Sequence, residues 1–370
     1  MAEKGSWGVF LVLILFNYVL FHYKVLSNKS FFQPIPSSRR TSVFILFTIM
    51  GLVGLQHGDY LSYAEEVREI ARASAPFKIT HLEVQYEQLA RFVHGNYILW
   101  RLVIFGGQFA ILFYYLKKTD LYSYGFLYIY SVLCLRSMVI GRATWGIVLF
   151  FCSTYYAIQS KNYKHLLVSP LCLFSHTSLI VLIAILPLVF LRLNKKSVFL
   201  FVALYFVLSF VLYYAFNNIS MFDTYEQTEM IGQRLESYSN PNRENSIGFF
   251  GNSLGSQLSN LPRRLGLLIL LIILFSKAYR NKNYIEHAIQ FLLLASLFLV
   301  MFSFVMLKGN FGAGTLSYRF FDMIHLPLTI VLYNMYKQEL IAGKLFQLFM
   351  GIFIFSLEVS LIMPLYYNSL

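Results

Sequence analysis

Charged residues are scarce in this chain: Asp, Glu, Lys and Arg make up 13% of its 370 residues, whereas soluble domains carry about 25%. Cysteine is scarce as well, and all three cysteines (Cys134, Cys152 and Cys172) lie inside apolar runs, which excludes a disulfide framework and a cysteine metal site. The sequence contains no HExxH, CxxC, P-loop or DxD motif. We therefore expect no bound metal, no nucleotide and no cofactor.

Apolar runs occupy most of the chain. Hydrophobic residues make up 58% of it, and the mean hydropathy is +0.60. Because a run of about 20 apolar residues can cross the hydrocarbon core, we predict an all-α, polytopic membrane helix bundle of about 11–12 spans. We expect residues 1–370 to form a single integral membrane domain. The predicted spans are 6–26, 41–55, 97–116, 121–135, 143–159, 165–175, 176–191, 197–216, 265–276, 284–307, 320–336 and 344–366.

The short loops on one side of the predicted bundle are rich in lysine and arginine. These loops are 22–40, 117–120, 160–164, 192–196, 277–282 and 337–344. By the positive-inside rule this side is cytoplasmic, both termini lie outside, and the net charge of +13 reflects topology and not nucleic-acid binding. The run 165–191 returns to the cytoplasm only as two short helices that meet at Ser175-His176; a single tilted helix is the alternative.

Two longer segments, 56–95 and 217–264, are predicted on the outer side. The first has apolar residues at helical spacing in two stretches, which predicts two amphipathic helices with a stop at Gly95. Most basic residues on the outer side are arginine, and the arginine fork suits phosphate and carboxylate groups. This bias indicates an outward-facing anion site, or else a drift in loop composition.

Three polar residues have positions that suit either a structural role or a role in catalysis or substrate binding. His176 interrupts an apolar run among hydroxyl side chains, so it is either a satisfied core residue or a general base. Asp59 follows the second span, where it suits a base, a ligand of a sugar hydroxyl, or the N-cap of the next helix. Glu83 has the capping-box spacing from Thr80, and a substrate contact is its alternative role.

Arginines at the outer ends of spans have the same double interpretation. Arg136 and Arg142 bracket a break between two spans, where they either extend to lipid phosphates or hold a diphosphate. Arg319 either pairs with Asp322 or points into a cavity, and Tyr318 beside it suits stacking on a sugar.

Several motifs keep a fixed order along the chain. They are Gly58-Asp59-Tyr60-x-x-Tyr63, Glu83-x-x-Tyr86, Arg142 at the start of a span, and Leu173-Phe174-x-His176-x-Ser178, followed later by Ser317-Tyr318-Arg319. This order resembles the EpsG family of polysaccharide polymerases, part of the wider group of Wzy-type O-antigen and capsule polymerases. The resemblance covers about residues 1–200 and is weaker beyond.

The resemblance implies a GT-C-like membrane enzyme that joins oligosaccharide units carried on undecaprenyl diphosphate. It implies a multi-pass protein of the bacterial cytoplasmic membrane with its active site facing outside. The implied partners are that lipid-linked oligosaccharide, membrane lipid and a chain-length regulator, without nucleic acid or metal. The implied site comprises His176 and Asp59 as catalytic residues, with Arg136, Arg142, Arg319, Tyr63, Glu83 and Tyr318 binding substrate.

Two other classes of membrane protein are alternatives. A membrane O-acyltransferase also uses an intramembrane histidine, but the outer arginine surplus and the Asp59 motif speak against it. A transporter or flippase would show broken helices in repeated halves, whereas this sequence has one such break and no repeat.

The predicted topology is testable by cysteine labelling with a membrane-impermeant reagent in intact cells. A cysteine at Ser197 should stay unlabelled, since the basic loop before it is predicted to be cytoplasmic, and one at Ser246 should react. Strong labelling at position 197 would contradict two helices meeting at His176.

Overall fold

In the computed structural model, helices form all the regular structure of the described residues, which are 31–53, 59–72, 84–139, 143–217, 254–305, 320–321, 323–351 and 353. A single isolated bridge between Pro34 and Ser123 is the only β pairing recorded among them. The all-α prediction is therefore confirmed for this part of the chain, and the predicted span 6–26 lies outside it. The chain divides into two compact units, Met1–Ile183 and Ala184–Leu370, called here the N-terminal and C-terminal units.

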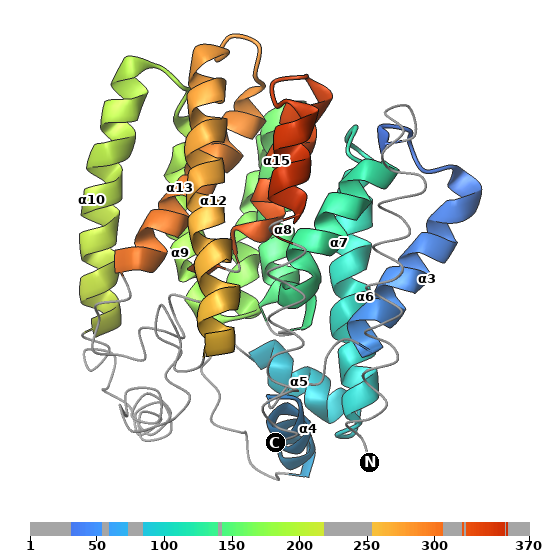
Figure 1. Cartoon of the computed structure of the whole chain (residues 1–370). Coiled ribbons are helices and arrows are strands. Elements are labelled where there is room, and N and C mark those ends of the chain that lie inside the picture. The colour runs from blue at the N-terminus through green and yellow to red at the C-terminus, as the bar shows by residue number, and fades with distance from the viewer. Residues whose placement is uncertain are drawn as a thin grey trace. The chain divides into compact units, whose positions relative to one another are not determined.

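The N-terminal unit matches the predicted spans closely (Figure 1). Its helices are α3 (Ser37–Val53), α4 (Asp59–Arg72), α5 (Val84–Phe92), α6 (Tyr97–Leu116), α7 (Tyr124–Val139) and α8 (Thr144–Ser160), followed by the 3₁₀ helices η3 (Tyr163–Leu167), η4 (Ser169–Phe174) and η5 (Thr177–Leu179). Helix α6 has the predicted bounds, because Asn96 caps its first turn through hydrogen bonds from the amides of Ile98 and Leu99. The predicted pair of amphipathic helices is confirmed as α4 and α5. The division between the units falls inside α9 (Ile180–Ile185).

The C-terminal unit differs more from the prediction. Its elements are η6 (Leu186–Phe190), α10 (Lys195–Asn217), α12 (Leu254–Arg280), α13 (His287–Val305), α15 (His325–Lys337) and a helical stretch at 343–351. Helix α12 extends well beyond the predicted 265–276, because hydropathy marks the apolar part of a helix and not its ends. Helix α15 begins at His325, since Met323 and Ile324 form a turn inside the predicted 320–336.

Three of the described helices are long and apolar enough to cross a membrane: Tyr97–Leu116, Lys195–Leu212 and His287–Val305. Tyr124–Cys134 and Ile180–Phe190 are apolar but shorter. The described part of the chain is therefore all-helical and of membrane character. The total of about 11–12 spans and a GT-C-like arrangement stay predictions.

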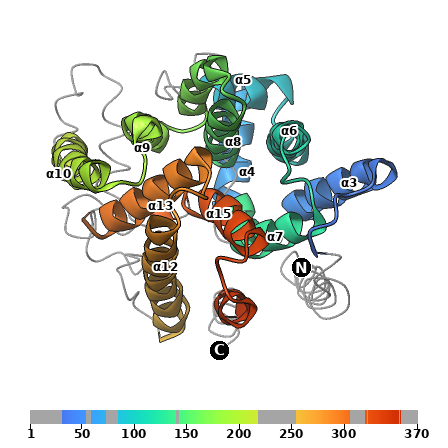
Figure 2. The same ribbon diagram turned by 90° about the horizontal axis from the view of Figure 1, so that it is seen from above.

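Helix α13 is the centre of the C-terminal unit. It contacts α10, α12 and α15, and Figure 2 shows it running between them. Its side chains are buried on every side, as expected of a helix that is apolar all round. Helix α10 instead exposes large apolar side chains, among them Phe199, Phe206 and Phe210, which suits a surface in contact with lipid.

The predicted cytoplasmic loops of the N-terminal unit meet at one end of it. The amide of Ile35 donates to the carbonyl of Tyr122 at 3.1 Å, which joins the loop before α3 to the loop before α7. The hydroxyl oxygen of Tyr115, near the end of α6, lies 3.4 Å from Nδ1 of His165. His165 comes just after the loop that follows α8. We call this the basic end of the N-terminal unit. The structure thus gathers loops that were predicted for one side of the membrane at one end of the unit.

Two basic loops of the C-terminal unit also meet. The side chain of Gln290 accepts from the amide of Leu193 at 2.8 Å and donates to the carbonyl of Lys282 at 3.0 Å. Nε2 of His287 lies 3.1 Å from the carbonyl oxygen of Leu191. These bonds fix the 191–193 segment to the start of α13. They bring loops 192–196 and 277–282 to one end of the unit, as predicted.

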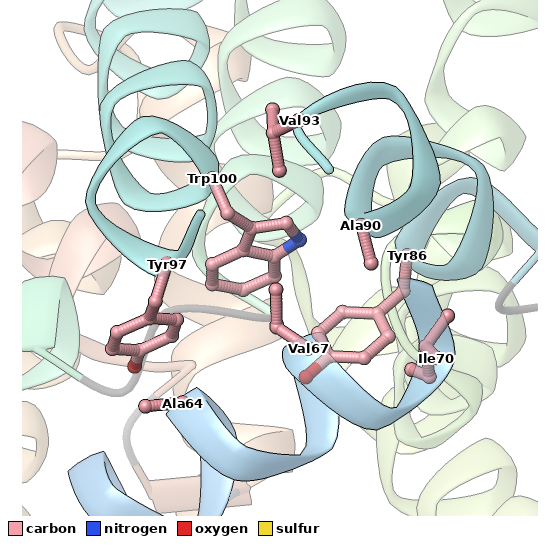
Figure 3. Packing of buried hydrophobic residues seen from close by; sticks show 8 residues of the cluster. All are labelled: Ala64, Val67, Ile70, Tyr86, Ala90, Val93, Tyr97 and Trp100. Atoms are coloured by element: carbon pink, nitrogen blue, oxygen red, sulfur yellow. The ribbon is translucent and has the colours of Figure 1, made fainter. Parts of the chain in front are cut away.

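Helices α4 and α5 pack on the start of α6 around Trp100 (Figure 3). The Trp100 side chain is 2% exposed and meets the Tyr86 ring edge-on at 5.0 Å between centroids. Val67 of α4 and Ala90 of α5, both fully buried, belong to the same cluster. After α5, Gly95 adopts a positive φ of 74°, and a β-carbon there would lie 3.2 Å from Ala71 Cβ. The cluster therefore anchors the predicted outer segment 56–95 to a membrane helix.

Replacing Trp100 by alanine should lower the free energy of unfolding by about 3–5 kcal/mol, since a large buried aromatic side chain leaves a cavity. Thermal unfolding of the purified protein measures this loss. Phe92→Ala on neighbouring α5 is the matched control, because that ring is 78% exposed. Equal losses in the two variants would contradict the packing role of Trp100.

Candidate functional site

The polar interruption at Ser175-His176 is a break between helices. The carbonyl of His176 accepts from the amide of Leu179 at 3.0 Å, which begins η5. Nδ1 of His176 accepts from the amide of Ser178 at 3.1 Å and lies 2.9 Å from its hydroxyl oxygen. His176 thus acts as the N-cap of the second helix. The cap satisfies an amide that hydrocarbon would leave without a partner.

The stretch before the break is a 3₁₀ helix packed along α8. Successive bonds such as Val168 amide to His165 carbonyl and Leu171 amide to Val168 carbonyl have the i to i+3 pattern. At ~2.0 Å per residue, residues 163–174 rise about 24 Å. The 17 residues of α8 rise about 25 Å at ~1.5 Å each, so the steeper 3₁₀ rise lets fewer residues retrace the whole helix. The split of the predicted 165–191 run at Ser175-His176 is confirmed.

Hydroxyl groups and a glycine hold this stretch against α8. Ser169 Oγ lies 2.8 Å from Ser153 Oγ and 2.9 Å from Thr154 Oγ1, and all three side chains are fully buried. At Gly146 a β-carbon would lie 2.6 Å from Leu179 Cδ1 and 2.7 Å from Ser175 Cβ. The residues on both sides of His176 therefore press directly on the first turn of α8. We call residues 175–179 together with this turn the His176 site.

The His176 site lies at the end of the N-terminal unit away from its basic end. Helices α6 and α8 contact each other, and near their last turns the rings of Tyr115 and Tyr156 are 5.8 Å apart. Since α6 and α8 end together, both begin at the opposite end. Helix α4, which begins at Asp59, packs at the start of α6. Arg136 stands in the last turn of α7, which runs back from the basic end.

The structure therefore brings the backbone of three predicted site residues to the end that holds His176. Asp59 is the first residue of α4, Tyr63 follows one turn later, and Arg136 lies in the last turn of α7. The other predicted site residues, Glu83, Arg142, Tyr318 and Arg319, lie outside the described residues.

Arg264 was missed by the sequence analysis. Its side chain is 1% exposed, and its guanidinium carbon lies 5.3 Å from the centre of the Phe321 ring in the C-terminal unit. The Phe321 ring also meets that of His325 at 5.8 Å, and His325 is buried. Arg264 stands at the start of an apolar run, as Arg142 does, and this position could have identified it. It was overlooked because it also ends the polar segment 217–264.

No group of three or more His, Cys, Asp or Glu side chains suited to a metal ion occurs among the residues that the structure describes. The polar groups of the His176 site are an imidazole, hydroxyls and backbone amides. Such groups bind and orient oxygen-rich substrates and can donate or accept protons.

Comparison with protein families gives a match to the EpsG family over residues 39–368. The chain belongs to the EpsG family. No curated protein and no solved structure matches it. The EpsG match extends through both units, well past the roughly 1–200 over which the motifs alone carried the resemblance. Family membership indicates a membrane-bound, glycosyltransferase-like polysaccharide polymerase.

Gly146→Ala tests whether close packing shapes the His176 site of this EpsG-family protein. The added methyl group has no room beside Leu179 and Ser175 unless the 175–179 turn shifts. The free energy of unfolding should therefore fall by about 1–3 kcal/mol. Thermal unfolding and polymer yield together measure the effect. Gly107→Ala in α6 is the matched control, since a β-carbon there meets nothing within 4 Å. Wild-type behaviour of both variants would contradict the close contact.

Proposed function

We propose that this protein joins oligosaccharide units carried on undecaprenyl diphosphate into a surface polysaccharide, such as an O-antigen, capsule or exopolysaccharide. The observation that carries the proposal is the His176 site itself. A polar, capped break in an apolar run sits beside the start of α8, within a chain of the EpsG family. Polar groups at membrane depth are costly and are retained where a substrate or proton uses them.

The proposed reaction needs two kinds of help from the protein. The acceptor hydroxyl attacks the anomeric carbon, and its proton goes to a base, for which His176 and Asp59 are the candidates. The leaving group is a diphosphate, which needs stabilisation of charge more than protonation. Arg136, Arg142 and Arg319 are proposed to supply it, with Tyr63, Glu83 and Tyr318 contacting the sugars. A single displacement of this kind inverts the anomeric carbon and requires no metal.

We further propose that the reaction takes place on the outer face of the bacterial cytoplasmic membrane. Support comes from the separation of the His176 site from the basic end of its unit, which the positive-inside rule assigns to the cytoplasm. The arginine surplus predicted for the outer side fits an anionic leaving group. Nucleotide sugars are cytoplasmic, so a donor used outside is lipid-linked. A chain-length regulator is a proposed partner.

The direct test is incubation of the purified protein with the undecaprenyl-diphosphate-linked repeat unit. A ladder of products that differ by whole repeat units is expected, and it should form in EDTA as well. Transfer of acyl groups instead of sugars would contradict the proposal. A requirement for Mg²⁺ or Mn²⁺ would contradict the metal-free mechanism.

Arg142→Lys and Arg319→Lys test the proposed diphosphate contact, since lysine keeps the charge and loses the paired donors. Turnover should fall about 10- to 100-fold, because one charge-assisted hydrogen bond contributes about 1.5–3 kcal/mol. Binding of the donor should weaken less than turnover falls, since charge grows in the transition state. Polymer formation at matched membrane levels is the measurement.

The control for these variants is Arg91→Lys. Arg91 forms an ion pair with Glu87 on its own helix at 2.9 Å, so a lysine there should leave polymer formation unchanged. Wild-type turnover in both Arg142→Lys and Arg319→Lys would identify these arginines as lipid anchors.

A further inference from the structure

The hydrogen bonds at the cap determine where the His176 ring carries its proton. Nδ1 lies 3.1 Å from the amide nitrogen of Ser178 and 2.9 Å from its hydroxyl oxygen. A backbone amide can only donate, so Nδ1 is the accepting nitrogen without a proton. Turning the ring over would place a C–H group against both donors. The neutral imidazole of His176 therefore carries its proton on Nε2.

Helix capping alone does not explain a histidine at this position. Serine, threonine, aspartate and asparagine are the preferred N-cap residues, and each would satisfy the Ser178 amide. Histidine adds a second ring nitrogen beyond the cap, and in this tautomer that nitrogen is a donor. The neighbouring Ser175 and Ser178 are buried, at 6% and 5% exposed, whereas His176 is only partly buried. Unlike the side chains of Ser175 and Ser178, the imidazole therefore keeps an accessible surface.

We propose that Ser178 is a positioning residue that holds His176 as the Nε2–H tautomer, so that His176 donates a hydrogen bond to the departing diphosphate and is not the general base. This inference rests on the polymerase function proposed above. To act as a base, Nδ1 would have to give up the donors of Ser178 and uncap η5. The remaining nitrogen, Nε2, already carries a proton.

The group transfer then proceeds as follows. The acceptor hydroxyl oxygen forms a bond to the anomeric carbon, and the bond from that carbon to the diphosphate oxygen breaks. The bonding electron pair leaves with undecaprenyl diphosphate, where the Nε2–H group of His176 stabilises the new negative charge. The hydroxyl proton goes to a carboxylate, for which Asp59 is the candidate. His176 keeps its own proton throughout.

The tautomer can be measured without substrate by ¹⁵N NMR of the full-length protein in lipid nanodiscs, with labelled histidine rings. The His176→Ser variant, which keeps an oxygen for the cap, identifies the His176 signals by their loss. We expect an unprotonated Nδ1 and a protonated Nε2. A proton on Nδ1, or equal amounts of both tautomers, would overturn the proposal whether or not the protein polymerises oligosaccharides.

Two substitutions separate a donor from a base in the polymerisation assay. His176→Gln puts an amide N–H near the position of Nε2 but cannot take up a proton, so it should keep activity within about tenfold of wild type. His176→Asn keeps a cap oxygen and draws the donor back, so it should lose about 10²–10³-fold, as when one oxyanion donor is removed. A folded His176→Gln variant no more active than His176→Asn would overturn the donor role and make His176 the base.

Ser178→Ala tests the positioning role through the same NMR signals. Loss of the hydroxyl leaves the Ser178 amide on Nδ1, so the Nε2–H tautomer should stay the major form while the share of the Nδ1–H tautomer rises and polymer formation falls. Ser153→Ala is the matched control, because this buried hydroxyl contacts Ser169 and not His176. An unchanged tautomer in Ser178→Ala would overturn the role of its hydroxyl. Failure of wild-type protein to polymerise would instead overturn the proposed function, while the tautomer result stands.

Discussion

A polypeptide inside hydrocarbon must satisfy every backbone amide and carbonyl with groups of its own. An unbroken α-helix does this without side chains, so each break in a helix needs polar side chains to replace the lost bonds. The break at His176 meets this requirement through an imidazole that accepts from the amide two residues later. The requirement of the backbone therefore decides which ring nitrogen accepts, and under the mechanism proposed above the same residue both caps the helix and takes part in the chemistry.

Close packing makes this arrangement possible within a short segment. The steeper rise of a 3₁₀ helix carries residues 163–174 along all of α8, and Gly146 lets the turn approach the helix without a side chain between them. The buried hydroxyls around Ser169 fix the register of the two elements. Long 3₁₀ stretches are uncommon and often mark functional segments. Here residues 163–174 connect the basic loop 160–164 at one end of the unit to His176 at the other end.

Charge and packing agree about the two ends of each unit. In the N-terminal unit, loops rich in lysine and arginine meet around Tyr122 and His165, while the His176 site and the anchored helices α4 and α5 occupy the other end. In the C-terminal unit, Gln290 joins two more basic loops. Buried Arg264 lies about 24 Å along α12 from Arg280, at ~1.5 Å per residue, and so belongs to the end away from those loops. In each unit, therefore, the lysine-rich loops lie at the end away from a polar group. That group is the His176 site in the N-terminal unit and buried Arg264 in the C-terminal unit.

Hydropathy, capping and loop charge could be read directly from the residues, because they depend on composition and on neighbours in the chain. They predicted α6 as the span 97–116, the pair α4 and α5, and the break at Ser175-His176. They did not predict that this run is largely 3₁₀, since an apolar pattern of this length fits several helix types. They also missed Arg264, whose burial depends on Phe321, more than fifty positions away.

The sequence by itself determined the helical class, the family motifs and the candidate chemistry, because each rests on residue type and short spacing. Tertiary structure alone decided that Gly146 is a contact and not a flexible position, and that His176 lies at the end of its unit opposite the basic loops. It also decided which nitrogen of His176 accepts. Such properties depend on atoms brought together by the fold, at distances of about 3 Å that spacing along a chain does not specify.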